Sequence, residues 1–348
     1  MRKIIGRLLY LLDGKGPQNR EKKTLMAREI LEGKSEKELK ELAQLIREVA
    51  TTGIGSDNCL EYGCLPLPVN FYSPVPDLKD LEQRAVWERR SPLSGIDFRQ
   101  EEQVRLLSHF GEAFGQECRW PKRPTTDRFQ FYTENDCFGF GCAAGLHCMI
   151  RHLRPRRIIE IGSGNSSLVV SAALKQNLEQ DRGLMCDYTI IDPFPNDLIS
   201  AEVLPGLTRL VRQRVEVADD FAADLEENDI LFIDSSHVVR TGGDVNYLIL
   251  DILPRLAPGV VVHFHDIDLP FAYPKVYFTN PRFRVFWTEA YLLQAFLTCN
   301  DHFEVLLAMG YLMKDRDEEF SNAFPFFQEH LDEPRSGSFW IRRKVKGK

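Results

Sequence analysis

Two carboxylates and two histidines follow two apolar segments in the second half of the chain. Asp234 and His237 come after the run at 229–233, and His265 and Asp266 end the run at 260–264. Neighbouring parallel strands lie about 4.8 Å apart, so we expect the ends of both segments to meet in one patch. Because two unpaired carboxylates repel each other at a partly buried site, a metal ion or a protonated histidine should lie between them.

A histidine in this patch can take the proton of a reacting hydroxyl, since its ordinary pKa lies near neutral pH. His237 or His265 could be this base, with Asp234 or Asp266 orienting the ring. We interpret His263, one step deeper on the same strand face as His265, as a buried and hydrogen-bonded residue. We favour a metal ion that holds the acceptor hydroxyl and lowers its pKa, with His237 available as base, and catalysis by a histidine without a metal is the alternative.

The segment EIGSGNSS, residues 160–167, follows an apolar run at 158–161 and opens a helical pattern at 167–179. Gly162 and Gly164 allow a sharp turn and a close approach of a ligand to the backbone. Ser166 or Ser167 can cap the helix. In open α/β sheets, ligands bind beyond the carboxyl ends of the strands, so this segment predicts a ligand-binding loop.

Acidic residues end the next two predicted strands. Asp192 follows the run at 188–191, where an acid commonly holds a pair of ribose hydroxyls. Asp219 and Asp220 follow a third run, at 215–217, where an adenine could rest. For these two, a plain loop position is equally compatible with the sequence.

The remaining elements predict the frame that positions these residues. Strands at 158–161, 188–191, 215–217, 229–233 and 260–264 alternate with helices, among them 167–179 and 244–256. Later come a helix at 289–299 and strands at 303–308 and 338–345. Continuous apolar strands alternating with helices indicate a parallel sheet that is covered on both faces, the α/β class.

With these motifs in order, the chain resembles the class I S-adenosylmethionine-dependent methyltransferases over residues 140–348. The resemblance lies in EIGSGNSS (160–167), IIDPFP (190–195), DILFIDSSH (229–237) and LAPGVVVHFHD (256–266). It implies a Rossmann-like sheet of seven strands in order 3-2-1-4-5-7-6, with strand 7 antiparallel. The cofactor-binding residues would be Glu160, Gly162, Ser163, Gly164, Asn165, Ser166, Asp192, Asp219 and Asp234.

The resemblance is greatest to small-molecule and sugar O-methyltransferases. In their metal-dependent members, two or three acidic or amide ligands occupy the strand tips, and the matching positions are Asp234, His265 and Asp266. His265 departs from the all-oxygen pattern. Mg²⁺ prefers oxygen ligands, whereas Mn²⁺, Fe²⁺ or Zn²⁺ accept imidazole more readily. The expected cofactors are therefore S-adenosylmethionine and a divalent ion such as Mg²⁺, Mn²⁺ or Fe²⁺.

An aromatic segment, residues 267–287, follows this patch. Aromatic rings stack on sugars or aromatic acceptors, and such segments form lids over active sites. Core packing is the alternative for several of them. Upstream, we expect a helical arm at 1–50, with a capping box from Ser35 to Glu38, and an accessory or lid region at 51–139. The methyltransferase domain would occupy 140–348.

Composition sets limits on the partners of the protein. The chain has 348 residues and a net charge of −7, which argues against binding to nucleic acid or to an anionic membrane. No apolar run reaches the roughly 18 residues of a membrane span. Arg7 interrupts the apolar N-terminal stretch, so we interpret it as an amphipathic helix and not as a signal peptide. Eight scattered cysteines favour a reduced, cytoplasmic protein.

The sequence thus predicts methylation of a hydroxyl on a small molecule or glycosyl unit, by an enzyme that could form a homo-oligomer. A metal-independent N-methyltransferase or sugar methyltransferase is an alternative. A non-catalytic binding protein that uses the same fold is another. The acceptor pocket of such a fold consists of variable loops, and the fold alone does not identify the acceptor.

Overall fold

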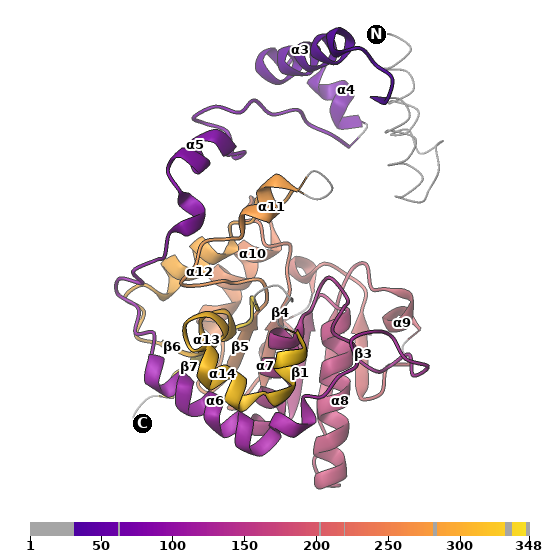
Figure 1. Cartoon of the computed structure of the whole chain (residues 1–348). Coiled ribbons are helices and arrows are strands. Elements are labelled where there is room, and N and C mark those ends of the chain that lie inside the picture. The colour runs from indigo at the N-terminus through magenta and orange to yellow at the C-terminus, as the bar shows by residue number, and fades with distance from the viewer. Residues whose placement is uncertain are drawn as a thin grey trace. The chain divides into compact units, whose positions relative to one another are not determined.

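The computed structural model describes residues 31–61, 63–201, 203–218, 220–280, 284–330 and 336–345. The chain forms two compact units, Met1–Arg84 and Ala85–Lys348 (Figure 1). Residues 85–139, which the sequence analysis grouped with 51–84, belong to the same unit as the sheet. The predicted arm is described only from residue 31 onward.

The first unit contains three described helices, α3 (Glu36–Thr52), α4 (Ser56–Glu61) and α5 (Leu78–Gln83). The predicted capping box is confirmed. The Glu38 amide donates to Ser35 Oγ at 3.3 Å, and the Ser35 amide donates to Glu38 Oε2 at 2.9 Å. None of the three helices buries a residue, and α3 exposes Leu39 and Ile46.

The second unit is built on a seven-stranded sheet whose order, β3-β2-β1-β4-β5-β7-β6, is the predicted one. The strands are β1 (Arg157–Ile161), β2 (Asp187–Ile191), β3 (Leu207–Val211), β4 (Ile230–Ile233), β5 (Val261–Phe264), β6 (Phe303–Ala308) and β7 (Phe339–Arg343). Strands β1 to β5 are parallel, and β7 is antiparallel to both β5 and β6. The sheet is therefore of the Rossmann-like type.

The third strand differs from the prediction. It is Leu207–Val211, whereas the predicted strand at 215–217 is a turn of 3-10 helix. β3 lies at the edge of the sheet and has no buried residue, so its sequence LTRLV lacks the continuous apolar run that marks the inner strands. The short run VEV resembled such a strand more closely.

The register of the inner strands aligns their carboxyl ends. Ile161 pairs with Ile191 on one side and with Ile233 on the other, and Ile233 pairs with Phe264. The residues that come immediately after these four positions must then emerge at one edge of the sheet. They are Gly162, Asp192, Asp234 and His265.

Helices flank the sheet in two groups (Figure 1). One group contains α6 (Gln100–Phe114), α7 (Phe140–Leu153), α8 (Asn165–Gln180), α13 (Met309–Asp315) and α14 (Asp317–Ala323). The other contains α12 (Glu289–Leu297) and the run Asp244–Asn246 (α10), Tyr247–Ile252 and Leu253–Arg255, which matches the helix predicted at 244–256. Short helices α9 (Asp197–Ser200) and α11 (Lys275–Thr279) lie in the connections, as do 3-10 turns at Val86–Glu88, Gly115–Glu117 and Pro325–His330.

No helix within the described ranges has both the length and the apolar character that crossing a membrane requires.

Candidate functional site

The loop after β1 approaches the backbone at the end of β4 too closely for any side chain. Gly162 has φ +81°, and a Cβ atom placed on it would clash with the carbonyl oxygen of Asp234. The Gly162 amide donates to Ile191 O at 3.0 Å, and the Asp234 amide donates to Ile161 O at 2.9 Å. A glycine is therefore needed to connect the first strand to the loop at this point.

Glu160 is entirely buried and holds the loop from within the sheet. Its carboxylate accepts hydrogen bonds from Ser166 Oγ at 2.6 Å, from Ser167 Oγ at 3.0 and 3.1 Å, and from the Tyr188 hydroxyl. Burial raises the pKa of Glu160 to about 7, against the lowering effect of these donors. The carboxylate thus fixes the first turn of α8, and its oxygens face hydroxyls of the chain itself.

Ser163 of the loop meets Asp192 at the end of β2. Ser163 Oγ donates to Asp192 Oδ2 at 2.5 Å, and the Phe194 amide donates to Asp192 Oδ1 at 2.7 Å. A Cβ atom on Gly164 would have no neighbour within 4 Å, so the space beside this part of the loop is open. Asn165 begins α8 next to it. Asp219 lies outside the described residues.

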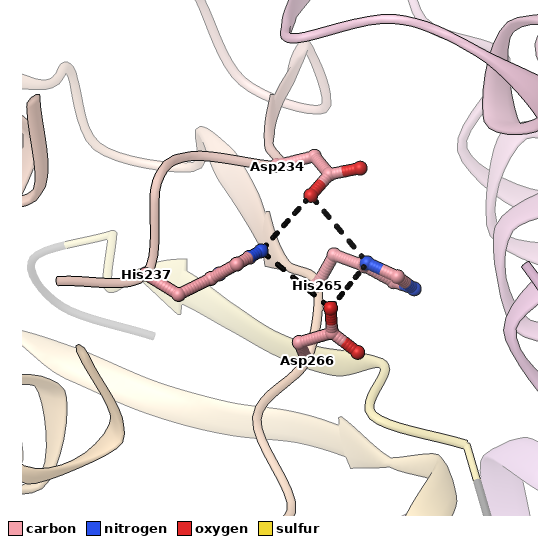
Figure 2. Close-up of side chains that lie close together, drawn as sticks. All are labelled: Asp234, His237, His265 and Asp266. Carbon is pink, nitrogen blue, oxygen red and sulfur yellow. Dashed lines mark ion pairs between the residues drawn. The ribbon is translucent and has the colours of Figure 1, made fainter. Parts of the chain in front are cut away.

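The predicted patch forms at the ends of β4 and β5, where Asp234, His237, His265 and Asp266 surround a common centre (Figure 2). The two carboxylates alternate with the two imidazoles around this centre. Asp234 Oδ1 lies 3.2 Å from His237 Nε2 and 3.5 Å from His265 Nδ1. Asp266 Oδ2 lies 3.5 and 3.4 Å from the same two nitrogens. All four ligand atoms fall within 4.8 Å of one another.

A fifth residue, Glu289, contacts the ring nitrogen of His237 that points away from the cluster. Its Oε2 lies 2.7 Å from His237 Nδ1, and Ser235 Oγ donates to its Oε1 at 3.0 Å. Glu289 is fully buried at the start of α12. Sequence reasoning missed this residue, because an acid in the first turn of a helix is ordinary and 52 positions separate the two partners.

The backbone at the cluster adopts a conformation that side chains other than glycine rarely take. His237 has φ +60° and Asp266 has φ +57°, both in the left-handed region. The backbone of Asp266 lies against Gly337, whose Cβ position is 2.6 Å from Asp266 Cα. The Ile267 amide also donates to Gly337 O at 2.8 Å. Such conformations persist where the surroundings fix them, and they concentrate at functional sites.

The electrostatics of the cluster favour positive charge at its centre. His237 and His265 are buried, whereas Asp234 and Asp266 are half-buried. Burial alone would lower the pKa of His237, but its partners Asp234 and Glu289 raise it to about 10. The pKa of His265 is also raised, against burial, by Asp266 and Asp234. Apart from its ion-pair contacts with Asp234 and Asp266, His265 Nδ1 has no hydrogen-bond partner among the described residues.

His263 behaves as predicted. It is fully buried below the cluster, and its Nε2 lies 2.9 Å from Ser338 Oγ. Burial lowers the pKa of its imidazole well below the ordinary value. His263 therefore belongs to the core and not to the centre formed by the four residues.

A cavity of about 360 Å³ opens beside the cluster. His265 and Asp266 line it together with residues of the loop 133–139 and with Tyr277. Phe138 of this loop packs against the His265 ring, with centroids 5.0 Å apart. Tyr277 and Trp287 belong to the predicted aromatic segment, and their ring centroids lie 4.7 Å apart. The centroid of the Trp287 ring lies 4.5 Å from that of the His237 ring. Two residues of the aromatic segment thus lie beside the site, Trp287 against His237 and Tyr277 in the lining of the cavity.

Comparison with known proteins identifies a methyltransferase domain in this part of the chain. A family model described as a methyltransferase domain matches residues 159–267. An uncharacterized protein of Archaeoglobus fulgidus is 32% identical over 177 residues, which are 49% of this chain and 78% of that protein. The plantazolicin methyltransferase BpumL in complex with SAH aligns over 71% of this chain and 98% of that chain, with 12% identity and a TM-score of 0.31. The last similarity carries no argument about the site.

Proposed function

This chain belongs to one family with the Archaeoglobus fulgidus protein and carries a methyltransferase domain, and from this premise we propose that it methylates a hydroxyl of a small molecule or glycosyl unit. The methyl donor is S-adenosylmethionine. The observation that carries the proposal is the position of the four-residue cluster, one strand away from the glycine loop that follows β1. This position supports a role of the cluster in binding or activating an acceptor beside the donor.

The residues around the glycine loop fit the cofactor. Gly162 leaves no room for a side chain, and Gly164 borders open space, so the backbone can lie against a ligand. Asp192 offers carboxylate oxygens at the end of β2, where ribose hydroxyls are commonly held. When bound, S-adenosylmethionine supplies an electrophilic methyl group on its sulfonium. The chain must then position a hydroxyl in line with that methyl and remove its proton.

The four-residue cluster fits a divalent metal ion. Metal–ligand bonds of about 2.1 Å put neighbouring ligand atoms about 3.0 Å apart at a bond angle of 90° and about 3.4 Å apart at the tetrahedral angle. The four neighbouring pairs of the cluster are 3.2 to 3.5 Å apart, and all four ligand atoms lie within 4.8 Å of one another, so they can share one ion. Two carboxylate oxygens and two imidazole nitrogens thus offer four donor atoms around one centre. We therefore add His237 to the three expected ligands, Asp234, His265 and Asp266.

Two imidazoles in the ligand set favour Zn²⁺, Fe²⁺ or Mn²⁺ over Mg²⁺. When bound, such an ion supplies a Lewis acid that lowers the pKa of an acceptor hydroxyl. Glu289 would fix the orientation of His237, because metal-binding histidines usually carry a carboxylate or carbonyl on their other ring nitrogen. Asp266 and His265 would present the site to the cavity that they line.

The test separates cofactor binding from chemistry. Calorimetry should detect binding of S-adenosylmethionine and S-adenosylhomocysteine to the purified protein. Transfer of a radiolabelled methyl group to a panel of hydroxyl compounds should be abolished by exhaustive chelation and restored by Zn²⁺ or Mn²⁺. Absence of cofactor binding would overturn the proposed activity as a whole.

Two other outcomes would reassign the cluster. If transfer survives chelation but falls steeply in His237→Ala or His265→Ala, the cluster works as a general base without a metal. If neither chelation nor these substitutions change the rate, the cluster is structural. Measurement of bound metal in the wild type and in Asp266→Asn gives a readout that does not depend on turnover.

A further inference from the structure

The cavity beside the cluster has an uneven charge distribution. Its charged lining groups outside the cluster are Lys122, Glu134, Asp136 and Glu329. Arg123 Nε donates to Glu134 Oε2 at 3.2 Å, so this carboxylate is balanced. Asp136 and Glu329 form no ion pair within the described part of the chain, and Lys122 is the one ammonium among the described lining residues.

A divalent ion held by neutral imidazoles would balance the two carboxylates of the cluster. Outside the cluster, the described lining residues then offer two carboxylates without an ion pair and one ammonium. At a volume of about 360 Å³, the cavity lies in the size range of small-molecule sites.

The loop that carries Asp136 is held in place. Asn135 Nδ2 donates to Tyr132 O and to Phe138 O, at 2.6 and 2.9 Å. Asn135 Oδ1 accepts from the amides of Cys137 and Phe138 at 3.0 and 2.7 Å. His265, whose Nδ1 lies 3.5 Å from Asp234 Oδ1 and 3.4 Å from Asp266 Oδ2, borders the same cavity. The hydrogen bonds of Asn135 thus hold Asp136 at the rim of a cavity that reaches the four-residue cluster.

We propose that this cavity binds the methyl acceptor and that Asp136 and Glu329 select an acceptor with a cationic amine close to its reacting hydroxyl, such as an amino sugar. The substrate class rests on the proposed methyltransferase function. Acceptors that carry a carboxylate, phosphate or sulfate are repelled by the same two carboxylates. Neutral polyhydroxyl compounds gain no charge-assisted contact there.

Cys137 is a natural reporter of the potential in this cavity. Its thiol lines the cavity and is exposed, and Cys299 is an exposed thiol that is absent from the lining. The experiment uses two methanethiosulfonate reagents, one with a cationic trimethylammonium-ethyl group and one with an anionic sulfonato-ethyl group. The rate at which each reagent modifies each cysteine is measured by mass spectrometry of the peptides. The ratio of the two rates at one cysteine cancels the intrinsic reactivity of the thiol, which substitutions nearby would change.

We expect the ratio of cationic to anionic modification at Cys137 to exceed that at Cys299 by about tenfold. Asp136→Asn and Glu329→Gln should each lower the Cys137 ratio by about threefold, and Lys122→Gln should raise it. The ratio at Cys299 should not change in any variant. A Cys137 ratio equal to that of Cys299, or unchanged by these substitutions, would overturn the proposal.

Ligand protection then tests the acceptor class without methyl transfer. Glucosamine, glucose and glucuronate share one ring and differ in charge. Glucosamine should protect Cys137 from neutral methyl methanethiosulfonate at about a tenth of the concentration of glucose, and glucuronate should protect least. Equal protection by the three, or none by glucosamine at its highest soluble concentration, would overturn the assignment. Failure of methyl transfer alone would leave these ratios unaffected and would contradict only the proposed function.

Discussion

At the scale of single residues, the protonation of Glu160 makes the stability of the protein depend on pH. Burial raises its pKa in the folded state to about 7, whereas an unfolded chain releases this proton near 4.5. The folded state therefore holds more protons between these values, and its stabilising contribution is lost as the pH rises through this range. The free energy of unfolding should fall by about 2–3 kcal/mol from pH 5 to pH 8 on account of this group.

Urea unfolding of the wild type and of Glu160→Gln at the two pH values checks this expectation. The variant should lose most of that dependence on pH. Glu329→Gln is the matched control, because Glu329 is exposed and should leave the dependence as in the wild type. If the free energy of unfolding falls equally between the two pH values in the wild type and in Glu160→Gln, Glu160 does not hold the proton.

Asp192 is the residue whose loss should affect the cofactor directly. Removing a charged acceptor costs about 1–3 kcal/mol, which is roughly a 5- to 150-fold loss of affinity for S-adenosylmethionine in Asp192→Ala. Asp187→Ala is the control, because Asp187 lies at the amino end of the same strand and Asp192 follows its carboxyl end. Calorimetry that finds equal affinities in the two variants would remove Asp192 from the cofactor site.

At the scale of elements, substitutions of the two glycines in the loop after β1 should affect different properties, stability at Gly162 and cofactor binding at Gly164. Gly162→Ala would place a Cβ against the Asp234 backbone, at a φ of +81° that a side chain rarely adopts. It should lower the free energy of unfolding by at least about 1 kcal/mol and disturb the cluster through Asp234. At Gly164 a larger residue such as valine has space in the protein and should weaken only cofactor binding.

Thermal unfolding and calorimetry on both variants distinguish the two effects. A Gly164→Val protein that binds S-adenosylmethionine as tightly as the wild type would show that the open space does not receive the cofactor. A Gly162→Ala protein of unchanged stability would show that β4 can move away from the loop.

Helix α12 should influence the metal centre through Glu289 alone. Glu289→Gln removes the carboxylate that orients His237 and should weaken binding of Zn²⁺ by about 10- to 100-fold. Tyr291→Phe, on the same helix, is the control, since this side chain is largely exposed. Competition with a chromophoric chelator measures the affinity without turnover. An unchanged affinity in Glu289→Gln would exclude His237 as an oriented ligand.

The sequence predicted the elements that are buried and missed what depends on three-dimensional packing. Strands β1, β4 and β5 are mostly apolar, and the ends of β4 and β5 predicted that Asp234, His265 and Asp266 would meet. The edge strand β3 has no such run and was missed. Glu289 could not be found, because its role depends on the packing of α12 against the loop that carries His237. The sequence also predicted His237 in this patch, as a base and not as a metal ligand. Its left-handed backbone, which residue types do not reveal, was not predicted.

At the scale of the whole molecule, the residues of the candidate site all belong to the unit Ala85–Lys348. Deletion of residues 1–84 should therefore leave the affinity for S-adenosylmethionine within about twofold of the full chain, which is less than 0.5 kcal/mol. Calorimetry on the shortened, folded protein provides the measurement, with circular dichroism as a check of folding. A folded deletion protein without cofactor affinity would show that the first unit contributes to the site.

The contact between Gly337 and Asp266 has a consequence for the order in which activity arises during synthesis. A growing chain has made every proposed ligand of the metal and every loop of the cofactor site by residue 289. The segment that supports the Asp266 backbone is made almost fifty residues later, together with β7, which completes the sheet between β5 and β6. A nascent chain can thus expose the ligand set before its geometry is fixed. Enzymatic competence should then appear only with the last strand, after the parallel part of the sheet has been synthesised.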